Sequence, residues 1–233
     1  MMFRKARAAT GFFALAIAAL FVAAPTAWAE AQHEKHINMS TKLMQEMQGQ
    51  KDASSLADTL KSAKGVAIFP SVIQAGLGIG GMSGEGVVFV KQGDGWGGPS
   101  FASIVGGSFG LQIGVKEVGL VLVIINDDGL LAFTGGKSFK LGGDISVAAG
   151  PVGRDAGAAT DSRAQASIYS YSMSKGLFAG LALSGSTINV NGDANKAYWG
   201  KATDAKTALA HKADGAKVKQ LISELNKLSK LAK

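Results

Sequence analysis

The stretch SYSMSKGLFAGLALSGS, from Ser170 to Ser186, has the pattern of a β-hairpin. Hydrophobic and small polar residues alternate on both sides of the pair Lys175-Gly176. Alternation of this kind is typical of strands, and a glycine between two such runs is typical of a turn. Leucines alternate with mostly small residues in the second run, which favours a hairpin that is buried on both faces.

The segment before this hairpin is rich in glycine, since residues 65–153 hold 23 of the 32 glycines. Glycine disfavours helices, so extended structure with many turns is expected. An unbroken aliphatic run at residues 118–125 predicts a strand buried on both faces. We expect an α+β fold whose β-rich core, residues 65–192, is a mainly antiparallel, barrel-like sheet. Further short strands are predicted at Gly65–Phe69 (ended by Pro70), Gly86–Lys91 (followed by a turn at 92–95), Phe109–Ile113 and Asp144–Ala148.

Helices are predicted on both sides of this core. Apolar residues recur at helical spacing in residues 32–48 and 52–64, and short helices are expected at 126–134 and 193–199. Lysines and acidic residues are mixed in the two N-terminal helices. Such mixing favours a solvated helix face.

The C-terminal tail, residues 201–233, is predicted to be a basic amphipathic helix with a net charge of +5. Apolar residues recur every three or four positions from Val218 to Leu231. The helix either lies on an anionic membrane surface or covers the sheet with its apolar side. The lysines expected to contact a membrane in the first case are Lys217, Lys219, Lys227 and Lys230.

Residues 1–29 have the pattern of a secretory signal peptide. A basic start precedes the uncharged residues 11–24, and Ala27-Trp28-Ala29 is the expected cleavage site, with Ala27 and Ala29 at its small-residue positions. The alternative is a membrane anchor, but the apolar run is shorter than the ~20 residues that span a bilayer. We therefore expect a periplasmic or secreted protein. The chain has no cysteine, so no disulfide is expected.

The charge distribution argues against a nucleic-acid partner. The whole chain carries +7, but residues 30–200 sum to −1. Nucleic-acid-binding domains usually carry a basic stripe on the domain itself.

Three glycine motifs resemble catalytic or phosphate-binding loops without the context that these need. Residues 76–81 contain G-x-G-x-x-G, but a strand follows, which favours a glycine-rich strand pair over a dinucleotide site. Residues 106–110 match G-x-S-x-G, but the only downstream histidine is His211 in the lysine-rich tail. Residues 135–138, GGKS, lack the first glycine of a phosphate loop. No catalytic residue, cofactor or enzymatic activity is predicted.

The chain also offers little for a metal. His33 and His36 lie close together near the cleavage site, and no cysteine is available. We expect an incidental surface pair and no metal site.

Several blocks resemble the SYLF domain family, a lipid-binding family of bacteria and eukaryotes. They are KSAKGVAIFPSVIQAG, FGLQIGVKEVGLVLVIIND, SVAAGPVGRDA, YSYSMSKGLFAGLALSGS and DANKAYWG, which together run from about Lys61 to Gly200. The resemblance implies a non-enzymatic domain that binds anionic lipid or a membrane surface, here in a bacterial cell envelope. The alternative is a structural protein that binds another envelope protein through its glycine-rich sheet.

Four cations lie beside glycines in or near these blocks, and they are Lys137, Lys140, Arg154 and Lys175. Lysine and arginine next to exposed backbone amides suit a phosphate head group. These residues either line a common anion site at one end of the sheet or are ordinary surface cations at turns.

Overall fold

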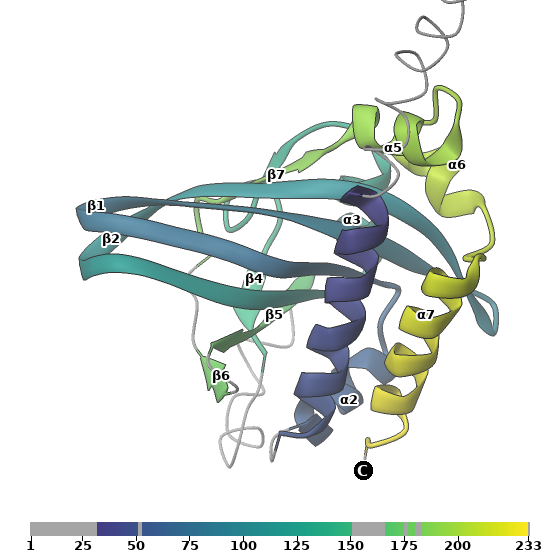
Figure 1. The fold of residues 1–233 in the computed structure, drawn as a ribbon, viewed down its shortest axis with the longest axis horizontal. Helices are drawn as coiled ribbons and strands as arrows, with labels where there is room; N and C mark the ends of the chain where they lie inside the picture. The colour runs from purple at the N-terminus through teal and green to yellow at the C-terminus, as the bar shows by residue number, and fades with distance from the viewer. Residues whose placement is uncertain (1–31, 51–52, 151–165, 175–176, 180–182, 233) are drawn as a thin grey trace, which may run out of the picture.

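The computed structural model describes residues 32–50, 53–150, 166–174, 177–179 and 183–232. The predicted signal peptide, with Ala27 and Ala29, lies outside these residues. The described chain is α+β, with a curled seven-stranded sheet and helices gathered around one end of that sheet (Figure 1). Among the seven described strands only β4 and β5 pair in parallel, so the predicted fold class is confirmed. The strands are β1 (Gly65–Gln92), β2 (Gly95–Ile124), β3 (Phe139–Lys140), β4 (Val147–Ala149), β5 (Ile168–Ser174), β6 (Leu177–Ala179) and β7 (Thr187–Val190).

The sheet order is β3-β7-β2-β5-β4, while β1 pairs with β2 and β6 pairs with β5. A helix at 32–48 comes first in the described chain. The other helices are α2 (Ala53–Lys61), α3 (Asp127–Thr134), α5 (Gly192–Trp199), α6 (Ala205–Ala210) and α7 (Ala216–Ser229).

β1 and β2 form one long hairpin, of 28 and 30 residues. The sequence predicts several short strands here, and that prediction is wrong. Pro70 does not end the first strand, because the register shifts between Phe69 and Val72 and the strand continues. Proline lacks an amide donor, and a bulge is one of the few places where a sheet tolerates it. The turn predicted at residues 92–95 does join the two strands.

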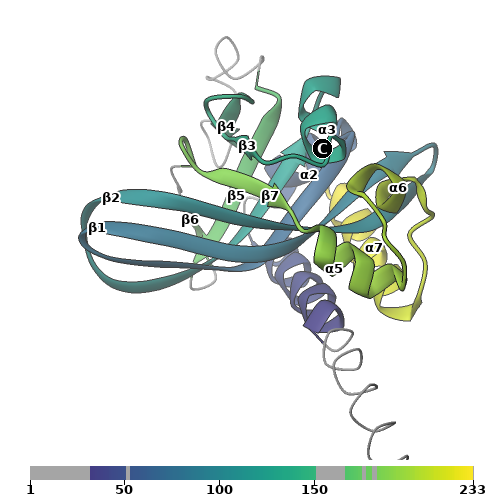
Figure 2. The same ribbon diagram turned by 90° about the horizontal axis from the view of Figure 1, so that it is seen from above.

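The long hairpin folds back on itself. The amide of Lys91, near the end of β1, donates to the carbonyl of Lys64 just before its start, at 2.8 Å. Between these ends, a Cβ on Gly84 would lie 2.7 Å from the carbonyl oxygen of Ser71, and one on Gly86 would overlap Ile68 and Phe69. The two halves of β1 therefore run antiparallel in close contact, and the bend lies at the end that projects from the helices (Figures 1 and 2).

Hydrophobic cores lie on both faces of the curled sheet. Residues alternate between them, so that Val121 and Val123 face one core while Leu120 and Leu122 face the other. Helix 32–48, α2 and α7 cover the first face, whereas α3, α6 and the segment 139–141 contribute to the second. The prediction that the aliphatic run is buried on both faces is confirmed.

The hairpin predicted around Lys175-Gly176 is present as the antiparallel pair β5–β6. In the described residues β6 covers only 177–179, which is shorter than the predicted second run. Tyr171 of β5 anchors α2, because its hydroxyl lies 2.5 Å from Thr59 Oγ1 and donates to the carbonyl of Ser55. Burial raises the pKa of Tyr171 to about 12, so this contact stays neutral at physiological pH.

The C-terminal tail forms two helices, α6 and α7, where the sequence predicts one. The chain turns at Gly215, whose φ of 90° favours glycine and separates them. The apolar side of α7 is buried in the core with helix 32–48 and α2. Of the two alternatives for the tail, the structure shows packing on the domain.

Replacing Gly86 by alanine tests the fold-back of β1. The new methyl group overlaps Ile68 and Phe69, so we expect a loss of about 1–3 kcal/mol in the free energy of unfolding. Gly192→Ala is the matched control, since no atom lies within 4 Å of a Cβ there. Urea unfolding should leave the control within about 0.5 kcal/mol of wild type. Equal stability of both variants contradicts the close contact.

Candidate functional site

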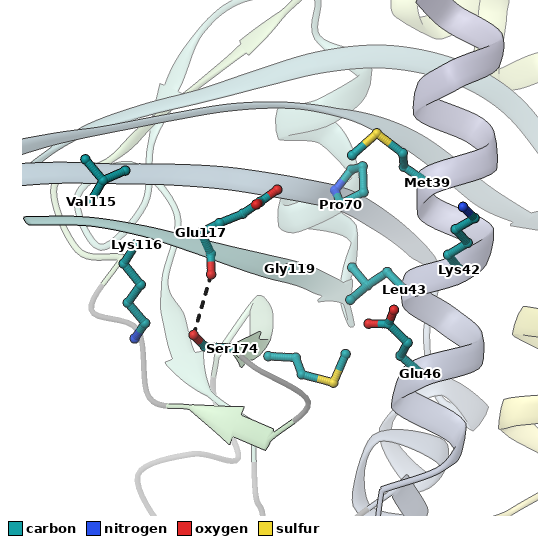
Figure 3. Close-up of a pocket in the computed structure, with 11 residues that line it drawn as sticks. Met39, Lys42, Leu43, Glu46, Pro70, Val115, Lys116, Glu117, Gly119 and Ser174 are labelled. Atoms are coloured by element: carbon teal, nitrogen blue, oxygen red, sulfur yellow. Dashed lines mark hydrogen bonds between the residues drawn. The ribbon is translucent and has the colours of Figure 1, made fainter.

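A groove of about 810 Å³ lies between helix 32–48 and the β1–β2 hairpin (Figure 3). One wall comes from the helix, and the opposite wall comes from β1, β2 and the end of β5. Figure 3 shows the helical residues facing those of the strands across the opening. The lining residues are Met39, Lys42, Leu43, Glu46, Pro70, Val115, Lys116, Glu117, Gly119, Met173 and Ser174.

The floor of the groove is apolar, and it depends on a close approach of the helix to β2. A Cβ on Gly119 would overlap the δ-carbons of Leu43, so only glycine lets the helix lie this near the strand. Leu43 and Met173 are buried there, and Pro70 adds its ring at the bulge of β1. The floor can therefore hold a hydrocarbon chain.

The rim of the groove is charged. Lys42 and Glu46 lie on the helix, and Lys116 and Glu117 lie on β2 (Figure 3). Glu117 accepts a hydrogen bond of 2.6 Å from Ser71 Oγ, while neither lysine takes part in an ion pair within the described residues. Both ammonium groups are thus available to an anion that enters the groove.

Beside the groove, the hairpin continues into a projecting part that we call the arm, residues 72–84 of β1 and 104–115 of β2. It extends beyond the helices in both views (Figures 1 and 2). None of its 25 residues is charged, and nine are glycine. Val115 is 75% exposed and Ile73 is 41% exposed, so the arm presents apolar side chains to solvent.

The histidines are not the incidental surface pair that the sequence predicts. His33 is buried, its ring centre lies 4.7 Å from that of Phe101, and its Nε2 has no hydrogen-bond partner among the described residues. His36 Nε2 lies 3.4 Å from Glu85 Oε2. Both line a second cavity, of about 570 Å³. The sequence prediction rested on the position of the pair near the cleavage site, whereas helix 32–48 packs against the sheet along its length.

The predicted anion site is only partly within the described chain. Lys137 and Lys140 are exposed, in the segment between α3 and the end of β3, and the amide of Lys140 donates to the carboxylate of Asp144. Arg154 and Lys175 lie outside the described residues. The common site of the four cations therefore stays a prediction.

The tail lysines are on the surface, and most contact acidic residues. Lys217 pairs with Glu34, Lys219 pairs with Asp214 at 2.6 Å, and Lys227 pairs with Glu224 at 2.8 Å. Lys230 is exposed near the end of α7. Because the apolar side of α7 is already buried, that side is not free to enter a membrane.

The glycine motifs lie inside strands. The G-x-G-x-x-G residues belong to β1, where Gly76 pairs with Gly114 and Gly81 pairs with Gly107, as the sequence predicts. The G-x-S-x-G residues lie within β2, without the strand-to-helix turn that a nucleophile elbow needs. Within the described residues, no three His, Cys, Asp or Glu side chains gather as metal ligands.

No described helix has an apolar run long enough to cross a bilayer.

The family model described as "Ysc84: Las17-binding protein actin regulator" matches residues 105–228. The chain belongs to this family. Among Ysc84-type relatives, LAS seventeen-binding protein 3 of Saccharomyces cerevisiae is 37% identical over 156 residues, and protein YSC84 of the same species is 36% identical over 154. SH3 domain-containing YSC84-like protein 1 of Homo sapiens is 36% identical over 144 residues. The resemblance to the SYLF domain family is confirmed.

The matches cover a larger part of this chain than of its Ysc84-type relatives. They span 66%, 65% and 61% of this chain, but only 34%, 33% and 42% of those three proteins. The family model includes the β2 and β5 side of the groove, whereas Met39, Lys42 and Leu43 precede it. The groove thus joins the family region to the N-terminal helix.

The buried His33 makes stability depend on pH. Burial and the nearby His36 lower the pKa of His33 below 6.5, so the unfolded state binds the proton more readily than the folded state. The free energy of unfolding should therefore fall as the pH drops below about 6.5, by up to roughly 1.4 kcal/mol per pH unit for one proton. Urea titrations of wild type and His33→Phe at pH 7.5 and 5.5 measure this. An identical pH dependence in both proteins would show that His33 does not contribute.

Proposed function

We propose that this protein is a non-enzymatic domain that binds anionic lipids at a membrane surface. The observation that carries the proposal is the groove, which combines an apolar floor with Lys42 and Lys116 at its rim. An amphiphile can place its hydrocarbon part on the floor and its charged head group near the lysines. The lipid role implied by the SYLF resemblance supports the same reading.

Two attractions act at the groove, one from charge and one from hydrocarbon burial. A lysine near an anionic membrane surface contributes about 1 kcal/mol of attraction. The two lysines at the groove therefore favour an anionic over a neutral membrane, while Glu46 and Glu117 on the same rim offset part of this attraction. Burial of hydrocarbon on Met39, Leu43 and Pro70 adds an attraction that does not depend on salt.

The predicted signal peptide extends the proposal to a location. Cleavage after Ala29 would deliver the domain to the periplasm or the exterior of a bacterial cell. There it would meet the anionic lipids of the cell envelope. An intact mass that begins at Glu30 for envelope-localised protein would support this, and a retained Met1 would contradict it.

A second candidate function is binding of another envelope protein through the glycine-rich sheet. The relatives favour it, because the names of the yeast protein and the family describe binding to a protein, LAS seventeen or Las17. The matched part is about a third of the yeast proteins, so that binding is carried over only as a proposal.

Charge reversal at the groove tests lipid binding directly. Lys42→Glu with Lys116→Glu should weaken binding to vesicles that contain phosphatidylglycerol by about 30-fold or more, since attraction is lost and repulsion is added. Co-sedimentation measures binding, and circular dichroism checks the fold. Surface charge changes usually alter stability by only about 0.5 kcal/mol.

Two further pairs control this experiment, each with the same change in net charge. Lys201→Glu with Lys206→Glu changes exposed residues at and before α6, and should leave most of the binding intact. Lys137→Glu with Lys140→Glu tests the anion site predicted from the sequence. Equal losses in all three variants would show that only net charge matters, and full binding by the groove variant would contradict the groove as the lipid site.

A further inference from the structure

The arm carries a second inference, which rests on the proposed function and adds a membrane contact outside the groove. Soluble domains rarely leave large apolar side chains exposed together without a role in binding. In the arm, Ala75 and Val115 are paired directly opposite each other, and Ile73 lies two residues before Ala75. These three positions share one face of the sheet, and all three are exposed.

The polarity along the arm has the same order as a bilayer interface. The arm itself is uncharged, and Lys116 follows directly at its base, with Lys42 on the helix across the groove. Three carboxylates lie near this level. Glu117, opposite Ile73 in the ladder, accepts a hydrogen bond from Ser71, Glu85 lies beside His36, and Glu46 is on the groove rim with Lys42. In a bilayer the anionic head groups lie outside the hydrocarbon layer. The lysines at the base of the arm match the head groups, and the uncharged apolar residues farther out match the hydrocarbon.

The open strand edges of the arm limit how deeply it can enter a membrane. The ladder between β1 and β2 pairs one edge of each strand along the arm, with a register shift between Leu77 and Ile79. Open strand edges do not enter the hydrocarbon core, because unpaired amides and carbonyls need water. The interfacial layer, where water still reaches the backbone, is therefore the depth that fits.

We propose that the arm inserts its apolar face, with Ile73, Ala75 and Val115, into the interfacial layer of an anionic membrane. The lysines at the groove then lie at the level of the head groups. The arm supplies the part of the binding that salt does not screen, and the groove lysines supply the part that it does. The natural absence of cysteine makes the inference easy to test, because a single introduced thiol carries a probe at one known place.

Val115→Cys, labelled with an environment-sensitive fluorophore, reports insertion in the full mature chain. Addition of vesicles of phosphatidylcholine and phosphatidylglycerol should raise its emission and shift it to the blue. The matched control is Leu131→Cys on α3, which is 65% exposed on the body of the domain. Its emission should not change. Vesicle binding by the labelled protein combined with a Val115 probe that stays in water would overturn insertion while leaving the proposed function in place.

A second pair of variants tests whether insertion contributes to affinity. Val115→Asp should weaken vesicle binding by roughly tenfold or more, since it places a charge where the membrane would bury an aliphatic group, and the loss should persist at high salt. Leu131→Asp should bind as wild type does. The high exposure of both residues leaves the fold intact, which thermal unfolding checks.

The remaining outcomes separate this inference from the proposed function. Weaker binding by the groove variant, together with the same Val115 blue shift once vesicles saturate it, supports both proposals. A blue shift at Val115 that appears without vesicles as the protein concentration rises would show pairing of two arms, and would overturn the membrane role. Absence of binding of the unmodified protein to vesicles of phosphatidylcholine and phosphatidylglycerol would overturn both proposals.

Discussion

The contact of β1 with itself is the constraint on which the rest of the molecule depends. A strand of 28 residues would form a long, flat ribbon if it stayed straight. Gly84 and Gly86 instead let its second half lie directly against Ile68, Phe69 and Ser71 of its first half. Because β2 follows β1 throughout, the whole hairpin doubles over, and β5 and β7 can pair with different parts of β2. The curl of the sheet follows from this doubling of the hairpin.

The same fold creates the two surfaces to which we assign function. Doubling brings the open and closed ends of the hairpin together under the helices, which gives the body two cores. The bend is left as an uncharged arm outside the body (Figures 1 and 2). Where helix 32–48 meets the base of the arm at Gly119, the groove opens. The groove and the arm therefore arise from the same fold-back that builds the two cores.

Much of the architecture could be predicted from local patterns. The aliphatic run before Asn126, the β5–β6 hairpin and the short helices at 127–134 and 192–199 are found where the sequence places them. The length of β1 could not, because Pro70 and the glycines read as strand ends when no tertiary contact is known. In the structure Pro70 lies in a bulge, and Gly84 and Gly86 lie against residues 68–72 of the same strand. A glycine that breaks a short strand and one that admits a neighbouring backbone look the same in sequence.

The candidate site was harder to predict than the fold. Leu43 and Lys42 belong to a helix and Lys116 to a strand more than 70 residues later, and no motif links them. The cations next to glycines were predicted as a site because a sequence motif consists of residues that are near one another in the chain. His33 was assigned to the surface because it lies close to the predicted cleavage site, although the rings of Phe101 and Tyr198 contact it. The uncharged composition of residues 72–84 and 104–115 was the one signal in the sequence that could have pointed to the arm.

The most direct test of this account is a distance within β1. Gln74 Nε2 lies 3.9 Å from Met82 Sδ across the fold, although a straight strand would separate the two residues by about 26 Å. Cysteines at both positions, in a chain that has no others, can be treated with a short thiol-to-thiol cross-linker and analysed by mass. The account predicts rapid cross-linking within one molecule of the folded protein, and its loss in denaturant. Free thiols or only intermolecular products in the folded protein would contradict it.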